Sequence, residues 1–524
     1  MKQLKAFIGM LVILLLVSAY GLTSAAVKQE GSAGTMATID DLATKRIGVP
    51  LGSVYDNFAV QRFPQATILH YNSTSDIILA LKNGKIDGSL ENMDMAKTVI
   101  NENPELAVLA DDVLVTPIGI GFNKNNSALR ERFNHFLAKT KSDGSFAALY
   151  KKWYESDLAT VQLTPFPSHP DGEKVIFAIA IATLPVTGYI NGEYAGFEVE
   201  LVKTFAHQEK LNLTITSMDF SALIPALAAG KADMIAATIS ITEERKKQID
   251  FSDSYQEDRV GMMVLKKNLS NAAQKEAAKE ATFWGNVREG FYNNIMKENR
   301  YLLIADGLKT TVVISLFSVL FGTVLGGGIC WLRMSRRRAL NLFARFYISL
   351  IRGIPVLVLL MLMYYVVFAT VSIDPVLVAV IAFGINFAAY VSEMFRTAIE
   401  SVDKGQREAG IAAGFSPIQT FIYIILPQAL KQVLPVYKGE LISLVKMTSI
   451  VGYVAVQDLT KASDIIRSRT FDAFFPLIMT AVLYFAIAWV LLLVLEAVER
   501  QTDPRYRRHQ AQITSGAPER SSAR

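Results

Sequence analysis

The feature that most constrains this chain is a row of apolar segments confined to its second half. Each segment approaches the roughly 20 residues that a helix needs to cross about 30 Å of hydrocarbon. Lys438, Glu440 and Lys446 interrupt the fourth one, so we expect it to be a broken span or to line a pore. The pattern predicts an all-α polytopic membrane domain of about five spans within residues 301–500. The segments lie at about 308–332, 352–372, 375–395, 436–456 and 474–498.

The first half has the pattern of a soluble α/β protein. From about Ala37 to Lys267, short β-branched runs such as Lys45–Pro50 alternate with amphipathic stretches such as Phe197–Glu209. Residues 268–300 are expected to be a linker. Because 51% of the 524 residues are hydrophobic and 19% are charged, the composition argues against a wholly soluble enzyme. The net charge of +5 is too small to indicate a nucleic-acid-binding surface.

The N-terminus has the composition of a secretory signal. Residues 1–25 carry Lys2 and Lys5, then an apolar run from Ala6 to Ala19, then small residues. The alternative is an anchor helix that is not cleaved. Either kind of segment exports the adjoining part of the chain, so the α/β part is expected on the outer side of the membrane.

Basic residues of the second half support the same topology. They cluster around residues 333–345, 404–407 and 500–508, and five spans place all three clusters, with the tail 501–524, in the cytoplasm. The segment Lys461–Arg469 is a basic exception on the outer side.

The loop after the third apolar segment carries the most informative motif. A short helix, a turn at a glycine and a second helix are expected here. Such a protruding pair can dock into a groove on a cytoplasmic partner, whereas the alternative is an ordinary loop between helices. The spacing resembles the coupling loop of ATP-binding-cassette (ABC) permeases. Its motif positions are Glu408, Ala409, Gly410, Gly414 and Pro427.

Three further stretches resemble the polar amino acid permease branch: Arg352–Pro355, Ala389–Arg396 and Ser443–Ser449. Met447 departs from that pattern, since these permeases commonly carry an acidic residue there. The resemblance implies a homodimer or pseudo-dimer of five-span units with a path between them. Candidates for the path are Tyr390, Glu393 and Arg396, which could instead form ion pairs inside the bundle.

The sequence excludes several kinds of chemistry. It contains no G-x-x-x-x-G-K-[ST] loop, so cytoplasmic ABC ATPase subunits are the expected partners that use ATP. The five histidines are scattered without the spacing of metal ligands, and no nucleophile motif is present. We expect a transport subunit that binds no cofactor or metal and catalyses no reaction.

The α/β part resembles a type II periplasmic solute-binding protein of family 3, a bilobed α/β fold. Val175–Leu265 is similar to its first lobe, through Gly196–Glu200 and Ile241–Arg245 among other motifs. Thr38–Glu155 is similar to the second lobe and ends with Lys152–Tyr154, like the family's C-terminus. The expected boundaries are 37–160 for lobe 2, 161–174 for a joining loop and 175–267 for lobe 1.

The lobes therefore stand in reversed order along the chain. We interpret this as one circularly permuted domain, because the two halves are complementary and do not repeat each other. Chain ends tolerate such relocation best at exposed positions with few contacts. The alternative is two incomplete copies of a tandem pair.

A free amino acid needs a cation for its carboxylate and an acceptor for its ammonium group. Arg245 suits the carboxylate because its planar fork donates two parallel bonds, although a lone arginine can also be a surface ion pair. By resemblance, Thr238 and Ser240 offer backbone groups and a hydroxyl, and Gly52 and Ser53 close over the carboxylate from the other lobe.

The remaining site residues match the family less closely. Phe220 resembles the aromatic wall that packs on the ligand, with a core aromatic as the alternative. The family's ammonium-binding aspartate aligns with Asn92, so Glu91 or Asp94 could substitute, or the ligand could lack an α-ammonium group.

These observations predict an ABC importer subunit that captures a small polar solute, foremost an amino acid, with its own fused receptor. The resemblance implies that it lies in a bacterial cytoplasmic membrane, with the receptor on the periplasmic side. The alternatives are a ligand-gated channel or a sensor that uses the same bilobed fold. A channel leaves the coupling motif unexplained, and a sensor needs a cytoplasmic signalling domain that a tail of 501–524 does not provide.

Overall fold

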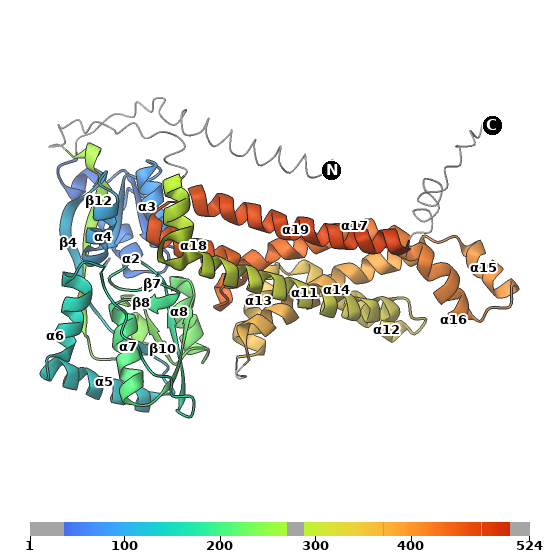
Figure 1. Ribbon diagram of the computed structural model, residues 1–524, viewed down its shortest axis with the longest axis horizontal. Helices are drawn as coiled ribbons and strands as arrows, with labels where there is room; N and C mark the ends of the chain where they lie inside the picture. The colour runs from blue at the N-terminus through green and yellow to red at the C-terminus, as the bar shows by residue number, and fades with distance from the viewer. Residues whose placement is uncertain are drawn as a thin grey trace.

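The computed structural model describes residues 36–269 and 288–502, apart from 159, 370, 372 and 473. The expected signal segment 1–25, most of the expected linker 268–300 and nearly all of the tail 501–524 lie outside the described residues. Figure 1 shows an elongated molecule, with the α/β part at one end and long helices that run away from it.

The first sheet of the α/β part has the order β2-β1-β3-β12-β4. Strand β1 pairs in parallel with β2 and β3, whereas β12 runs antiparallel to both β3 and β4. Helices α2 (Val54–Arg62), α3 (Thr74–Lys82) and α4 (Met93–Glu102) connect the strands. The strands are β1 (Arg46–Pro50), β2 (Thr67–Tyr71), β3 (Gly88–Asn92), β4 (Leu106–Ile118) and β12 (Gln256–Leu265).

The second sheet has the order β11-β5-β10-β6-β9. Its strands are β5 (Gly121–Phe122), β6 (Lys174–Ile179), β9 (Asn212–Ser217), β10 (Met234–Ala236) and β11 (Asp250–Phe251). Its helices are α5 (Ser127–Ser142), α6 (Ser145–Tyr150), α7 (Phe197–Gln208), α8 (Phe220–Ala228) and α9 (Glu243–Lys246), and a small hairpin joins β7 (Gly188–Ile190) to β8 (Glu193–Ala195).

This strand order corrects the lobe boundaries that we expected from the sequence. The chain crosses between the sheets twice, after Ile118 and again before Gln256, so lobe 2 consists of residues 36–118 and 256–269 and lobe 1 of residues 121–251. The segment 121–155, expected in lobe 2, packs in lobe 1. Its amphipathic helix α5 places Phe133 against Phe205, with ring centroids 5.1 Å apart, and this aromatic face completes the core of the second sheet.

Within the described residues, three helices are long and apolar enough to cross a membrane, or up to five spans if each of two bent helix pairs counts as one. One bent pair contains the fourth expected segment, with a break of 56° before Leu459. The helices are α11 (Arg300–Arg333), α12 (Arg338–Gly353), α13 (Val356–Leu362, continued by η6 to Val367), α14 (Pro375–Glu400), α17 (Leu426–Met447, followed by η8, Thr448–Val454), α18 (Leu459–Thr470) and α19 (Phe474–Thr502).

Helices α11 and α14 pack closely because small residues line their contact. A Cβ atom at Gly322 would lie 2.7 Å from the carbonyl oxygen of Gly384, and one at Gly326 would lie 3.1 Å from that of Ala388. Small residues that let helix backbones approach are the usual basis of helix association in membranes.

The coupling motif folds into two short helices, α15 (Lys404–Ala412) and α16 (Pro417–Thr420), at the end of the molecule farthest from the sheets (Figure 1). Gly414 has φ = +86°, which a glycine adopts without strain. Gly410 lets the helices touch, because a Cβ atom there would lie 2.6 Å from Cγ2 of Thr420.

Because Trp153 packs in lobe 1, replacing it should destabilise that lobe. This side chain is 1% exposed in the core of lobe 1, and its Nε1 donates to Glu200 at 2.8 Å. We expect Trp153→Ala to cost about 3–5 kcal/mol. Hydrogen exchange should quicken in lobe 1 while lobe 2 stays protected, and Trp153→Phe should cost less. Loss of protection confined to residues 36–118 would contradict the corrected boundaries.

Candidate functional site

A cavity of about 300 Å³ lies between the two lobes. Lobe 2 contributes the start of α2 and of α3 together with Glu91 of β3, and lobe 1 contributes the start of α8 and Arg245 of α9. Helix α18 of the helical part supplies a third side. The charged side chains that line the cavity are Asp76, Glu91, Asp219, Asp464, Arg245, Lys461 and Arg467.

Arg245 joins the two lobes across this cavity. Its Nη1 donates to the carbonyl of Ser240 at 3.0 Å within lobe 1, and its Nη2 donates to the carbonyl of Gly52 at 3.1 Å in lobe 2. The guanidinium carbon lies 5.8 Å from the ring centroid of Phe220, which also lines the cavity. A guanidinium that faces the cavity beside an aromatic wall suits a carboxylate with an apolar neighbour.

The start of α2 adds donors for an anion. Gly52, at φ = +75°, turns the chain into the helix, and Ser53 occupies the N-cap position. The Ser53 hydroxyl donates to the carbonyl of Pro50 at 2.7 Å and does not cap the helix. Because the first amide groups of a helix lack intrahelical partners, those of α2 beside the cavity can receive a carboxylate.

Glu91 is the acidic group at the floor of the cavity. The side chain is 1% exposed, and its Oε1 has no hydrogen-bond partner among the described residues. Burial and the nearby carboxylate of Asp258 raise the pKa of Glu91 to about 8. A buried carboxylate oxygen without a partner is costly, so a ligand ammonium group at this position would satisfy it.

Asn92, which aligns with the family's aspartate, has a structural role here. Its Oδ1 accepts from the backbone amides of Asp94 and Met95 and caps α4, and its Nδ2 donates to Asp258 at 2.7 Å. Asp94 accepts from Gln256 and lies near Lys97. Of the three acceptors considered from the sequence, Glu91 alone lines the cavity. Asn92 does not line the cavity, and its amide group is engaged by α4 and Asp258.

Thr238 and Ser240 both line the cavity, and some of their polar groups already form hydrogen bonds within the protein. The Thr238 amide donates to Glu198 at 2.8 Å and its hydroxyl donates to the carbonyl of Ala237. Ser240 accepts at its hydroxyl oxygen from Thr116 at 3.0 Å and keeps its own proton available. The hydroxyl of Ser240 can thus serve a ligand, whereas the amide of Thr238 cannot.

Five charged residues of the cavity were not proposed as site residues from the sequence: Asp76, Asp219, Lys461, Asp464 and Arg467. Asp219 directly precedes Phe220, and the last three stand inside the basic exception Lys461–Arg469. Neither signal reveals that these side chains meet in one cavity.

A second cavity lies among the membrane helices, with a volume of about 380 Å³. Tyr390 and Glu393 line it, and the guanidinium of Arg352 lies 4.9 Å from the Tyr390 ring centroid. Arg396 pairs with Glu393 at 2.7 Å, and Arg333 lies 3.4 Å from the same carboxylate. Among the path candidates, Tyr390 and Glu393 thus line a cavity, and Glu393 and Arg396 form an ion pair.

The helices α15 and α16 expose most of their motif. Glu408, Ala409, Gly414 and Pro427 are exposed, whereas Gly410 is buried at the contact between the helices. Large apolar side chains are exposed around them, including Ile411, Phe415, Ile418 and Tyr423. Exposed apolar groups at one tip of a molecule are typical of a protein-binding surface.

Comparison with known proteins identifies the α/β part. Residues 39–156 and 175–434, more than half of the chain, match the model of the bacterial extracellular solute-binding proteins, family 3. The chain belongs to this family. The gap in the match, at 157–174, contains the expected joining loop.

Curated relatives identify the helical part. A putative glutamine transport system permease protein, GlnP, of Rickettsia felis is 33% identical over 204 residues, 38% of this chain and 94% of that protein. The probable amino-acid ABC transporter permease protein YckA of Bacillus subtilis is 35% identical over 214 residues, 41% of this chain and 95% of that protein. A solved amino acid ABC transporter with histidines is 33% identical and covers 42% of this chain and 99% of its own, with a TM-score of 0.37. The helical part is an amino-acid ABC transporter permease, fused to its receptor.

The raised pKa of Glu91 predicts that acid weakens ligand binding. A ligand ammonium group pairs with the ionised carboxylate, so below about pH 8 a proton must leave Glu91 when the ligand binds. Between pH 8.5 and pH 6.5 the dissociation constant should therefore rise by about 25-fold. Calorimetry in two buffers should detect the released proton.

Glu91→Gln is the matched control, since it keeps the shape of the side chain and cannot titrate. Its dissociation constant should vary little over the same pH range. An unchanged pH dependence in Glu91→Gln would show that another group binds the ammonium.

Proposed function

We propose that this protein is the receptor and permease subunit of an ABC importer for amino acids. The observation that carries the proposal is one chain with a two-lobed ligand cavity at one end and exposed coupling helices at the other (Figure 1). A ligand bound at the cavity and energy supplied at α15 and α16 would act on the same set of membrane helices.

The cavity chemistry supports a zwitterionic ligand. Arg245 and the start of α2 can hold a carboxylate, Glu91 can hold an ammonium group, and Phe220 can pack on a side chain. Apart from Glu91, three carboxylates face three cationic groups along the walls, so the cavity holds no surplus positive charge for the second carboxylate of an acidic amino acid. Three of the curated relatives are named for transport of glutamine, cystine and arginine, which are neutral or basic amino acids.

The membrane arrangement follows from the same proposal. The receptor faces the periplasm, and α15 and α16 face the cytoplasm, where separate ATPase subunits dock on their exposed apolar side chains. Two such permeases, as a homodimer or with a related subunit, enclose the path that Tyr390, Glu393 and Arg396 border. The chain itself binds no cofactor and hydrolyses no ATP.

The receptor is proposed to be a circular permutant. Its two ends meet within lobe 2, where the backbone amide of Met36 donates to the carbonyl of Asn268 at 2.7 Å and Met36 forms a parallel bridge with Leu269. A chain that joined these two points would run in the family's usual lobe order. This contact supports a single permuted domain over two incomplete copies.

Transport would begin with closure of the lobes on the ligand. The two crossings, after Ile118 and before Gln256, are the points where a hinge can act. The ligand favours the closed form only through contacts that both lobes make with it, and Arg245 and Glu91 supply those contacts from opposite lobes.

The direct test is calorimetric titration of the full chain, in lipid nanodiscs, against the twenty L-amino acids and matched carboxylates without an amino group. We expect one or a few neutral or cationic amino acids to bind at one site per chain. Arg245→Ala should raise the dissociation constant at least tenfold, since two charge-assisted bonds of about 1.5–3 kcal/mol each are lost. Tighter binding of the carboxylates that lack an amino group would exclude an amino acid receptor.

The coupling role is tested at Gly414. No atom lies within 4 Å of the position that its Cβ would occupy, so Gly414→Asp disturbs no neighbour within the described residues and places a charge on the exposed turn. We expect ATP-dependent uptake to be lost while ligand binding by the full chain stays normal. Gly414→Asn, of equal size and tolerant of positive φ, should retain part of the uptake. Unchanged uptake in Gly414→Asp would count against docking at this turn.

A further inference from the structure

Helix α18 of the permease forms a wall of the receptor's own ligand cavity. Thr460, Lys461, Asp464, Ile465, Arg467 and Ser468 all line it, and most of them recur at helical spacing on one face. The wall is strongly charged, which is unusual for a surface that only closes a gap.

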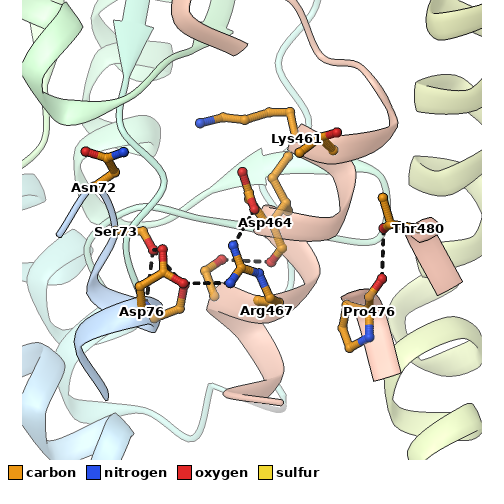
Figure 2. A network of polar contacts seen from close by, with 12 residues as sticks. Asn72, Ser73, Asp76, Lys461, Asp464, Arg467, Pro476 and Thr480 are labelled. Atoms are coloured by element: carbon orange, nitrogen blue, oxygen red, sulfur yellow. Dashed lines mark hydrogen bonds and ion pairs between the residues drawn. The ribbon is translucent and has the colours of Figure 1, made fainter. Parts of the chain in front are cut away.

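Two ion pairs hold this wall, one to each lobe. Lys461 Nζ lies 2.7 Å from Oδ1 of Asp219 in lobe 1, and Arg467 Nη1 lies 2.6 Å from Oδ1 of Asp76 in lobe 2. Arg467 also pairs with Asp464 of its own helix at 2.5 Å. Figure 2 shows Arg467 between Asp76 and Asp464, with Lys461 farther along the same helix.

These pairs are sheltered from solvent. The side chains of Lys461 and Arg467 are 10% and 12% exposed, and those of Asp219 and Asp76 are 19% and 33% exposed. Fully exposed pairs contribute little, whereas breaking a sheltered pair leaves a charge in poor contact with water. Breaking either pair therefore carries a cost, which a fully exposed pair would hardly have.

The other side of α18 is fixed to the membrane helices. The amide of Leu459 donates to Oγ1 of Thr311 in α11 at 3.2 Å, and the hydroxyl of Tyr484 in α19 donates to Asp458 at 2.8 Å. Arg469, near the end of α18, pairs at 2.8 Å with Glu298, just before α11. A displacement of α11 or α19 would thus move the wall.

We propose that α18 is a lid on the ligand cavity, held closed by one ion pair to each lobe, so that the permease half sets how long a ligand stays bound. This inference rests on the proposed function and adds the group that controls ligand release. Separation of the lobes moves Asp76 away from Asp219, and a helix of fixed length cannot then keep both partners. Release of the ligand therefore requires that at least one pair opens.

The test compares variants of the full chain in nanodiscs. Asp219→Asn and Asp76→Asn each remove one pair, and Asp87→Asn is the matched control because its partner Arg46 lies in the same lobe, at 2.9 Å, away from α18. The dissociation rate of the radiolabelled L-amino acid that binds the unmodified chain best is the first measurement. Hydrogen exchange of residues 459–470 without any ligand is the second.

We expect Asp219→Asn and Asp76→Asn to speed ligand dissociation about fivefold and to raise exchange in 459–470, with Asp87→Asn unchanged. Lys461→Gln, alone or combined with Asp219→Asn, should release the ligand no faster than Asp219→Asn alone. The same ion pair is lost in all three variants. Rates equal to those of the unmodified chain, additive effects or unchanged exchange would overturn the lid.

The two measurements separate this inference from the function on which it rests. If no amino acid binds the unmodified chain, the proposed function fails, and exchange in the ligand-free chain still decides whether the pairs hold α18. If ligands bind and dissociate at equal rates from all variants, the function stands and the lid is wrong.

Discussion

The receptor half depends on the hydrogen bonds of the Arg245 guanidinium, because this one group is bonded to both lobes at once. One of its nitrogens donates to a carbonyl of lobe 1 and another to a carbonyl of lobe 2. Carbonyl oxygens are weak partners for a full positive charge, so the site retains a strong attraction for an anion. Glu91 has the opposite property, a negative group held largely neutral by burial. A zwitterion would satisfy both groups together, and neither half of the cavity could do so alone.

Much of this arrangement could be predicted from the sequence, because the strongest signals were local. The apolar segments predicted the membrane part, and the spacing from Glu408 to Pro427 predicted the helix-turn-helix at its tip, with Gly414 at the left-handed position. Arg245 was expected in the ligand site because its guanidinium suits a carboxylate and it ends the family motif Ile241–Arg245, and the structure places it in the cavity.

The features that could not be predicted depend on long-range packing. Helix α5 is amphipathic, but its pattern does not say which of two sheets will bury Phe133. The family resemblance pointed to Asn92, but Asp258, which lies 166 positions away, accepts from the amide of Asn92, and Glu91 lines the cavity in its place. The basic segment Lys461–Arg469 violated the usual charge asymmetry of membrane loops. Its partners Asp219, Asp76 and Glu298 explain the violation, since these cations face protein carboxylates in place of water.

The fusion of receptor and permease has a consequence for the traffic of ligand. A tethered domain meets its docking surface at an effective concentration on the order of millimolar, whatever the amount of protein in the cell. In the proposed importer each permease chain works with its own receptor, and a loaded receptor from elsewhere has to displace the resident one from α18. Uptake is therefore limited by how often one resident domain is refilled. A cell that needs faster uptake has to make more of the whole machine, because extra receptor alone has nowhere to act.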